Sequence, residues 1–181
     1  YSELGNQQNA LNYYQQALVL AFEVGDVPWQ QKLIENLNSA TQKLVEKGVE
    51  HINTNHPETA ILYLQKALTI YQELEYSLGE AVVLHELSLA FHVLKEHTTA
   101  IEYSQQSIVI WEELQAYEQL ARSEENLANI YTVIRDYSKA IEYHQISLRR
   151  MRETQDKQGE ASVLGNLGNV YALQKEYDVA I

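Results

Sequence analysis

Hydrophobic residues recur three and four positions apart through most of the chain, which is the pattern of helices that bury one face. No stretch shows the strict alternation of apolar and polar residues that predicts a strand. The pattern therefore predicts an all-α fold. Its helices are expected at residues 7–24, 28–53, 57–75, 80–95, 98–116, 119–135, 138–155 and 160–174.

The two ends of the chain continue the same pattern. We expect residues 1–4 to be the tail of one helix, with Gly5–Asn6 as the turn that follows it. A last helix is expected to begin shortly before Ile181. Both ends would then lack the polar caps that close a helical array, so we expect the chain to be part of a larger protein.

A unit of 40 residues is repeated along the chain. Residues 126–131 (NLANIY) recur at 166–171 as NLGNVY, and alanine recurs at the same offset from Ala60 to Ala100 and Ala140. Internal repetition on this scale indicates an α-solenoid of stacked antiparallel helix hairpins. We expect a single array over residues 1–181. Its repeats are residues 1–25 (partial), 26–78, 79–118, 119–158 and 159–181 (partial).

The repeat over residues 26–78 departs from the period, because Ala10 and Ala60 are 50 residues apart instead of 40. The extra residues lie in the segment that precedes Ala60. They predict either one long helix over 28–53 or two helices with a break near Asn38–Ser39.

Small residues at equivalent positions predict that helices approach one another closely, so that a larger side chain there would overpack the contact. One column holds Ala60, Ala100, Ala140 and Ala180, and the facing column holds Gly48, Ser88, Ala128 and Gly168. Glu124 occupies a column that is otherwise filled by leucine. We expect it either to loosen the local packing or to find a polar partner.

The repeated unit resembles the tetratricopeptide repeat. The residues that carry the resemblance are Leu127, Tyr131, Tyr137 and Ala140, with Leu167, Gly168, Tyr171, Tyr177 and Ala180. The common form of that repeat has about 34 residues, so this chain is similar to the longer-helix branch found in kinesin light chains and bacterial signalling arrays. The resemblance implies a right-handed superhelix with ligand contacts on its concave face.

The resemblance places these contacts on exposed positions of the first helix of each pair. The candidate peptide-binding residues are Asn126, Asn129, Asn166, Asn169, Arg122, Glu125, Glu86, His85, Leu89 and His92. The four asparagines form a ladder, and each amide carries donors and an acceptor that match the backbone of an extended peptide. The alternative is that these amides brace neighbouring helices or are solvated.

The formal net charge of −12 argues against a nucleic acid or an anionic membrane as partner. It mildly favours a basic or neutral partner, although a solvated acidic surface is the commoner explanation of such a charge. The family's basic clamp for a C-terminal carboxylate needs Lys and Arg beside the asparagines. Those positions hold Glu86 and Glu125 here, with Arg122 as the lone cation. We therefore expect a basic or neutral segment as ligand.

Catalytic and metal chemistry find no support in the sequence. The chain has no cysteine, and its six histidines do not form a zinc motif. It contains no phosphate-binding loop or nucleophile elbow. No apolar run approaches the roughly 20 residues that cross a bilayer. We expect a cytoplasmic protein that is not an enzyme and that needs no metal or cofactor.

The sequence thus predicts a scaffold that binds a peptide or protein segment along a concave groove. The alternative is a self-associating or spacer segment of a multidomain signalling protein, because uncapped ends expose apolar surface that a second copy could cover.

Overall fold

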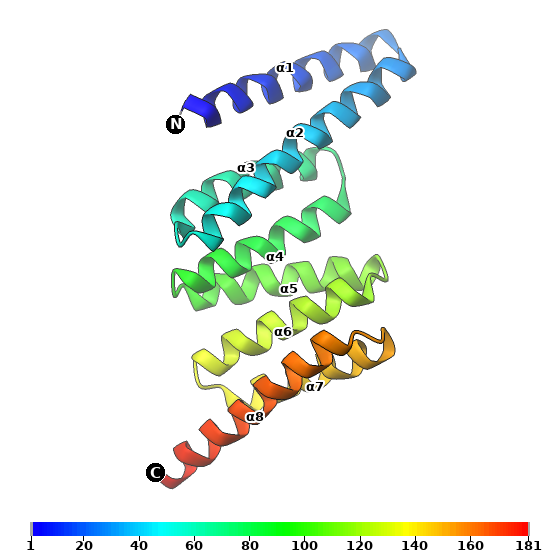
Figure 1. Cartoon of the computed structure of the whole chain (residues 1–181). Coiled ribbons are helices and arrows are strands. Elements are labelled where there is room, and N and C mark those ends of the chain that lie inside the picture. The colour runs from blue at the N-terminus through cyan, green and yellow to red at the C-terminus, as the bar shows by residue number, and fades with distance from the viewer. Residues whose placement is uncertain (1, 181) are drawn as a thin grey trace. The chain divides into compact units, whose positions relative to one another are not determined.

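The computed structural model describes the backbone of residues 2–180 and the side chains of residues 9–175. Within these residues the structure is all-α, without strands (Figure 1). The helices are α1 (Ser2–Val24), α2 (Val27–Asn53), α3 (Pro57–Glu73), α4 (Ser77–Val93), α5 (His97–Glu113), α6 (Tyr117–Val133), α7 (Tyr137–Glu153) and α8 (Lys157–Ala180).

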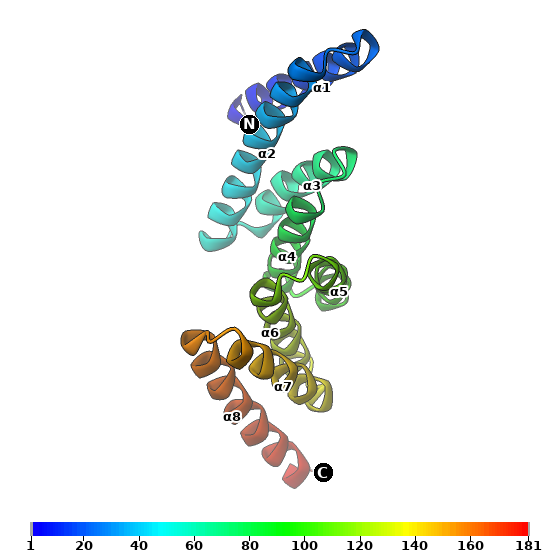
Figure 2. The same cartoon turned by 90° about the vertical axis from the view of Figure 1, so that its right-hand side faces the viewer.

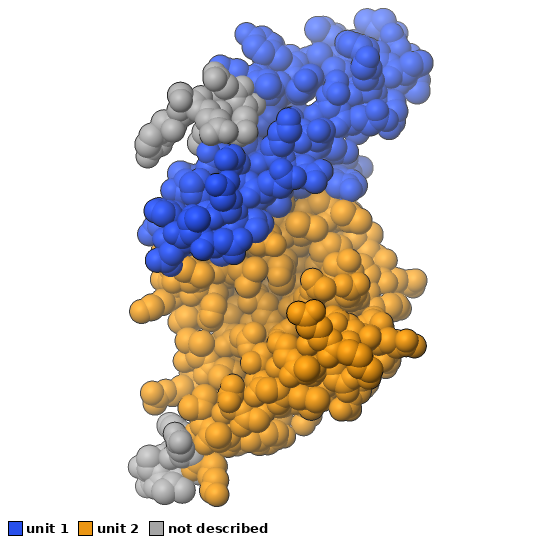
Figure 3. Space-filling model, viewed as in Figure 1, with its two compact units in different colours: residues 1–76 blue, residues 77–181 orange. Residues whose placement is uncertain are grey.

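The chain divides into two compact units, residues 1–76 and 77–181 (Figure 3). In unit 1, α2 packs against both α1 and α3. In unit 2, α4 pairs with α5 and α6 pairs with α7, while α8 packs mainly on α7. The division falls close to the predicted boundary between the repeats at 26–78 and 79–118.

A residue with left-handed backbone ends each helix from α2 to α7. These residues lie 20 positions apart and are Asn55, Glu75, Lys95, Gln115, Arg135 and Gln155, with φ between 51° and 65°. In the turn after α4, the Lys95 N–H donates to the carbonyl of His92 and the Glu96 N–H to that of Phe91. This pair of backbone hydrogen bonds is the Schellman motif, which satisfies the last carbonyls of a helix.

The helix bounds agree with the predicted ones to within a few residues, except at the two ends. α2 is one unbroken helix, which decides between the two predictions for residues 28–53. The predicted turn at Gly5–Asn6 is wrong, because α1 runs through it. The predicted break after residue 174 is wrong as well, because α8 continues to Ala180.

A turn with left-handed backbone is costly, and the packing of a full second helix against the first offsets that cost. Residues 2–4 provide about one helical turn and residues 175–180 fewer than two, which is less than the full helix that would pack against a neighbour. Continuing the existing helix satisfies their backbone at lower cost. Tyr177 and Ala180 are among the residues that carry the family resemblance, and their side chains lie outside the described residues.

The predicted columns of small residues do mark close helix contacts in the complete hairpins. Ala60, Ala100 and Ala140 are fully buried. Ser88 adds a hydrogen bond across the α4–α5 contact, with its hydroxyl 2.8 Å from the carbonyl of Ala100. At Gly168 the prediction is wrong, because a Cβ built there meets nothing within 4 Å. The straight course of α8 leaves Gly168 without a facing helix.

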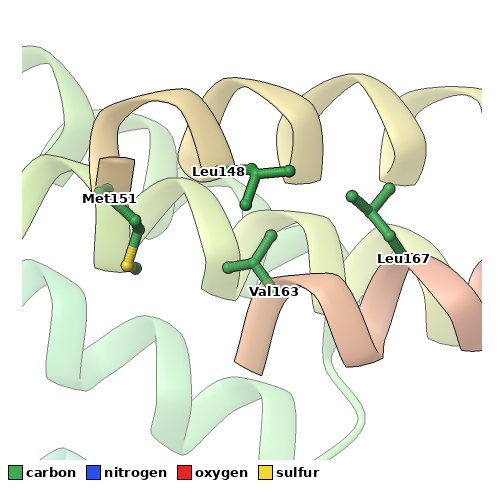
Figure 4. Packing of buried hydrophobic residues seen from close by; sticks show 5 residues of the cluster. Leu148, Met151, Val163 and Leu167 are labelled. Carbon is green, nitrogen blue, oxygen red and sulfur yellow. The ribbon is translucent and has the colours of Figure 1, made fainter. Parts of the chain in front are cut away.

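Apolar clusters hold consecutive helices of unit 2 together. In one cluster, Leu148 and Met151 of α7 face Val163 and Leu167 of α8 (Figure 4), and Ala121 of α6 completes it. All of these residues are buried. The cluster fixes α8 against the α6–α7 hairpin, and it therefore positions the residues of α8 that the sequence analysis singled out.

Glu124 has a polar partner, which confirms one of the two expectations for this residue. Its side chain is 5% exposed, and the Nε atom of Arg150 donates to both carboxylate oxygens at 2.8 and 3.0 Å. Burial raises the pKa of Glu124, and the Arg150 guanidinium opposes that rise. The ion pair joins α6 to α7 at a position where the other repeats have leucine.

Replacing Lys95 with glycine is expected to raise the free energy of unfolding by about 1 kcal/mol, because glycine adopts left-handed backbone without steric cost. Glu102→Gly, at an exposed position inside α5, is the matched control. It should lower the free energy of unfolding by about 1 kcal/mol. Urea unfolding followed by circular dichroism measures both, and a destabilised Lys95→Gly variant would contradict the role assigned to this turn.

Gly48→Ala is expected to destabilise unit 1. A Cβ at this position would lie 2.6 Å from Cγ of Leu64, which is fully buried, so the Leu64 side chain or the helix would have to shift. Overpacking costs about 1–3 kcal/mol, which exceeds the roughly 1 kcal/mol that alanine gains over glycine in a helix. Gly165→Ala, where a Cβ meets nothing within 4 Å, should be stabilising instead. Thermal unfolding measures both changes in stability, and we expect Tm to fall in Gly48→Ala and to rise in Gly165→Ala.

Candidate functional site

The first helices of unit 2 form one continuous face. α6 contacts both α4 and α8, whereas α5 and α7 do not contact each other in the described part of the unit. Figure 2 looks nearly along α5 and shows α4 and α6 on the same side of it. Because the first helices touch and the second helices are spread apart, unit 2 curves toward the side of α4, α6 and α8.

A hollow of about 420 Å³ opens on this face between α6 and α8. Its polar lining residues are Asn129, Asn166, Asn169, Thr132 and His144. Val170, Ala172 and Leu173 supply its apolar part. Three rungs of the predicted asparagine ladder are therefore brought together at one place.

The fourth asparagine of the ladder, Asn126, was expected to be exposed, and that expectation is wrong. Asn126 is 7% exposed, and its amide donates to the hydroxyl of Ser88 on α4 at 2.8 Å. The residue equivalent to Ser88 in the next repeat is Ala128, which has no hydroxyl to offer Asn166. Asn126 is thus a helix brace, the alternative role that the sequence left open.

Asn166 instead donates to Glu125 of α6, with its amide nitrogen 3.1 Å from Oε1. The Ser162 hydroxyl donates to the same oxygen at 2.7 Å. Glu125 therefore joins α6 to α8 beside the hollow. Asn129 and Asn169 make no hydrogen bond with another side chain or backbone group among the described residues. Their amides remain available to a ligand.

Arg122 and Glu125 also border a second hollow of about 400 Å³, on the side of Asp156 and Ser162. Arg122 is exposed and pairs with Glu118, four residues earlier, at 2.8 Å. Both side chains are more than half exposed, so this pair contributes little to stability. Arg122 is accordingly a cation at the border of the face rather than part of the asparagine hollow.

His85 and Glu86 line a smaller hollow of about 190 Å³ together with Arg122 and Trp111. The Nδ1 atom of His85 lies 3.0 Å from the Ser123 hydroxyl. Burial, with Arg122 nearby, lowers the pKa of His85 to about 4. Burial raises the pKa of Glu86 to about 7. The raised pKa favours the protonated, uncharged form of Glu86 and so reduces the negative charge expected on this face.

The remaining two candidates, Leu89 and His92, are half-buried on α4 and line none of these three hollows. The ring of His92 lies 5.4 Å from that of His97, and burial with His97 nearby lowers the pKa of His92. We assign both residues to the packing of the α4–α5 hairpin.

His144 is the residue of the hollow that the sequence analysis missed. It lies on a second helix, α7, where only packing residues were expected. Its equivalents in the two preceding repeats are Leu64 and Ser104, so a histidine in a column of buried small or apolar residues was the available signal. His144 is 0% exposed, and neither ring nitrogen has a hydrogen-bond partner among the described residues.

Comparison with protein families finds the tetratricopeptide repeat over residues 119–181. Those residues contain the α6–α7 hairpin and α8, and hence the whole asparagine hollow. Residues 119–181 belong to the tetratricopeptide repeat family. No curated protein matches the sequence of this chain.

Solved structures with the tetratricopeptide-repeat fold match nearly the whole chain. The apo form of RapI is 18% identical over 94% of this chain and 66% of its own, with a TM-score of 0.69. A Rap protein complexed with competence and sporulation factor is 14% identical over 97% of this chain and 53% of its own, with a TM-score of 0.71. The repeats of a putative kinesin light chain from Podosopora anserina are 17% identical over 99% of this chain and 84% of their own, with a TM-score of 0.56.

These likenesses show the fold, an all-α solenoid of helix hairpins. The chain spans about two thirds of RapI and about half of the second Rap protein. None of the helices in the described residues has the length and apolar character that a membrane span requires. The described side chains also contain no group of three or more residues that could hold a metal ion.

Unit 1 carries a separate exposed apolar surface at the turn between α1 and α2. The large side chains that are more than 40% exposed there are Val19, Leu20, Phe22, Val24, Val27 and Trp29. Part of this surface lines a hollow of about 230 Å³. Exposed apolar surface of this kind is a candidate for contact with another protein.

Glu86→Gln is expected to change how the free energy of unfolding depends on pH. Between pH 4.5 and about 7 the folded protein holds a proton on Glu86 that the unfolded chain releases. Stability therefore falls as the pH rises through this window. His85 gives the opposite slope, because its pKa is lowered from 6.5 to about 4. The difference between the free energies of unfolding of the parent and the variant at each pH cancels the contribution of His85. What remains is the contribution of Glu86.

The measurement is urea unfolding at pH values from 4.5 to 7.5. The variant should gain stability relative to the parent as the pH rises. Glu102→Gln, on the exposed surface of α5, should leave the parent's slope unchanged. A parent and a Glu86→Gln variant with parallel curves would contradict the burial assigned to this carboxyl group.

Proposed function

We propose that the chain is an interaction scaffold that binds an extended peptide segment in the hollow between α6 and α8. The observation that carries the proposal is the convergence of Asn129, Asn166 and Asn169 on one hollow. The repeat fold supports it, because stacked hairpins present the first helices on a concave binding surface. The volume of about 420 Å³ is within the usual range of ligand sites.

Asparagine amides suit the backbone of a peptide. Each side chain offers two N–H donors and a carbonyl acceptor, so it pairs with a peptide C=O and N–H regardless of the peptide's side chains. Asn129 and Asn169 lie on adjacent first helices and have no other described partner. They are therefore the two residues expected to hold the backbone, with Asn166 anchored by Glu125 between them.

The charge of the face favours a neutral or basic segment. The residues that line the hollow include no lysine or arginine to bind a carboxylate. Glu125 lies at its border, and the chain as a whole carries a net charge of −12. An acidic peptide would be repelled, and a nucleic acid or anionic membrane would be repelled more strongly. The role is one of binding rather than catalysis, and we expect it to be carried out in the cytoplasm.

A second candidate is self-association through the exposed surface at the α1–α2 turn. The apolar side chains from Val19 to Trp29 favour it, since a second copy would remove them from water. This candidate corresponds to the spacer or self-associating segment that the sequence left open. Sedimentation as a monomer over a wide range of concentrations would contradict it.

The test of peptide binding is selection from a library of random decapeptides displayed on phage. The parent protein is expected to enrich a family of neutral or basic sequences. The Asn129→Ala, Asn169→Ala double variant should bind the selected peptides about tenfold or more weakly, because each lost hydrogen bond contributes about 0.5–1.5 kcal/mol. Isothermal titration calorimetry with the selected peptides provides the affinities.

Asn53→Ala, at an exposed asparagine at the end of α2, is the matched control and should bind like the parent. Asn126→Ala should lower the stability of the protein without removing a contact to the peptide, because it breaks the hydrogen bond to the Ser88 hydroxyl. Equal affinities for the parent and the double variant would move the binding surface away from this hollow. Failure of the parent to enrich any peptide would contradict the proposed function itself.

A further inference from the structure

The most unusual group in unit 2 is the imidazole of His144. It is completely buried on α7, and both its ring nitrogens lack a hydrogen-bond partner among the described residues. Native proteins rarely leave buried polar atoms unpaired, since each loses its hydrogen bonds to water without replacement. A buried serine at the equivalent position in the preceding repeat is paired, because the hydroxyl of Ser104 donates to the carbonyl of Ser123 at 3.2 Å.

The fold does not require a histidine at this position. Leu64 and Ser104 occupy the same column and are also completely buried. Leucine would fill the site without an unpaired polar atom, so the imidazole is an avoidable cost to stability. Residues that lower stability without a structural need are typical of functional sites.

His144 is also a lining residue of the asparagine hollow, beside Asn129, Asn166 and Asn169. The ring itself has no exposed surface, so a ligand group reaches it only by displacing side chains that line the hollow. Asn169 and Leu173 are two exposed lining residues, and no described hydrogen bond holds Asn169 in place.

Burial lowers the pKa of His144 to about 4, so the ring is neutral at physiological pH. A neutral imidazole has one N–H donor and one acceptor nitrogen. The other polar lining groups, three amides and the Thr132 hydroxyl, are also uncharged and both donate and accept. A charged ligand group would lose its hydration here without meeting an opposite charge among the lining residues, which disfavours its binding.

We propose that His144 is a specificity-determining residue at the base of this hollow, where it selects an uncharged carboxamide side chain, that of Asn or Gln, in the bound peptide. A carboxamide complements either nitrogen of the ring, because it donates as well as accepts. A carboxylate only accepts and an ammonium group only donates, and both are charged. This inference rests on the proposed peptide-binding function and adds to it the class of side chain that is recognised.

The first test is a measurement of stability that needs no ligand. His144→Leu introduces the residue found at Leu64 and removes the unpaired nitrogens. It is expected to raise Tm by about 2–4 °C. His56→Leu, at an exposed histidine just before α3 whose ring is hydrogen-bonded to Thr54, shows the effect of the same replacement elsewhere. A lower Tm for His144→Leu than for the parent would mean that the imidazole is needed for packing, and would overturn the inference.

The second test uses immobilised pools of random decapeptides in which one central position is held as Asn, Gln, Glu, Lys or Leu. The parent protein should retain the Asn and Gln pools about tenfold better than the Glu and Lys pools. His144→Leu should bring the Asn and Gln pools down to the level of the Leu pool. His144→Gln should keep the preference, because glutamine also donates and accepts.

The outcomes separate this inference from the proposed function. Retention of all pools alike by the parent, or an unchanged Asn and Gln preference in His144→Leu, would overturn the role of His144 and leave peptide binding intact. Retention of no pool by the parent would contradict peptide binding, and the inference would fall with it.

Discussion

Every complete hairpin in the chain depends on a turn in which one residue adopts left-handed backbone. From Asn55 to Gln155 these residues are spaced 20 apart, and each is followed by a closing N–H···O=C bond to the end of the preceding helix. The turns fix the length of α3 to α7 at 17 residues. Because the helices have equal length, residues 40 apart occupy equivalent places, and the small columns, ring pairs and hydrogen bonds recur in register.

The recurring contacts show how little change in sequence is needed to convert packing into a site. Rings 12 residues apart stack in each hairpin, as in His51–Tyr63, Phe91–Tyr103 and Tyr131–Tyr143. The hydroxyls of Ser107 and Ser147 donate to equivalent carbonyls one repeat apart. Where Ser88 is replaced by Ala128, the next asparagine loses its buried partner. The contact between α6 and α8 is then lined by the amides of Asn129, Asn166 and Asn169 instead of being closed by a brace.

The chemistry of this face is set by burial more than by formal charge. Burial raises the pKa of Glu86 and lowers the pKa of His85 and His144, so that burial favours the uncharged form of each. The ion pair between Glu124 and Arg150 joins α6 to α7, and neither residue lines the hollow between α6 and α8. A chain with a net charge of −12 therefore presents a hollow whose lining is neutral, which is suited to the uncharged parts of a peptide.

Much of the architecture follows from the sequence alone. The 40-residue period, the all-α fold and the helix bounds of α2 to α7 could be predicted, because periodicity and turn chemistry are local properties of the chain. The grouping of Asn129, Asn166 and Asn169 followed from the same period. The outer ends of α1 and α8 could not be predicted from that pattern, since a turn persists only where a full helix packs behind it.

The roles of Asn126 and His144 depended on tertiary contacts. Two asparagines 40 residues apart in matching sequence have different functions, because one meets the Ser88 hydroxyl and the other meets Glu125 across the helix contact. His144 belongs to a column that the period assigns to packing. Only its position behind the α6–α8 contact, without a partner for either nitrogen, makes it part of the site. Hydrogen-bond partners between helices are separated by 38 or more residues in these cases, and no local pattern in the sequence specifies them.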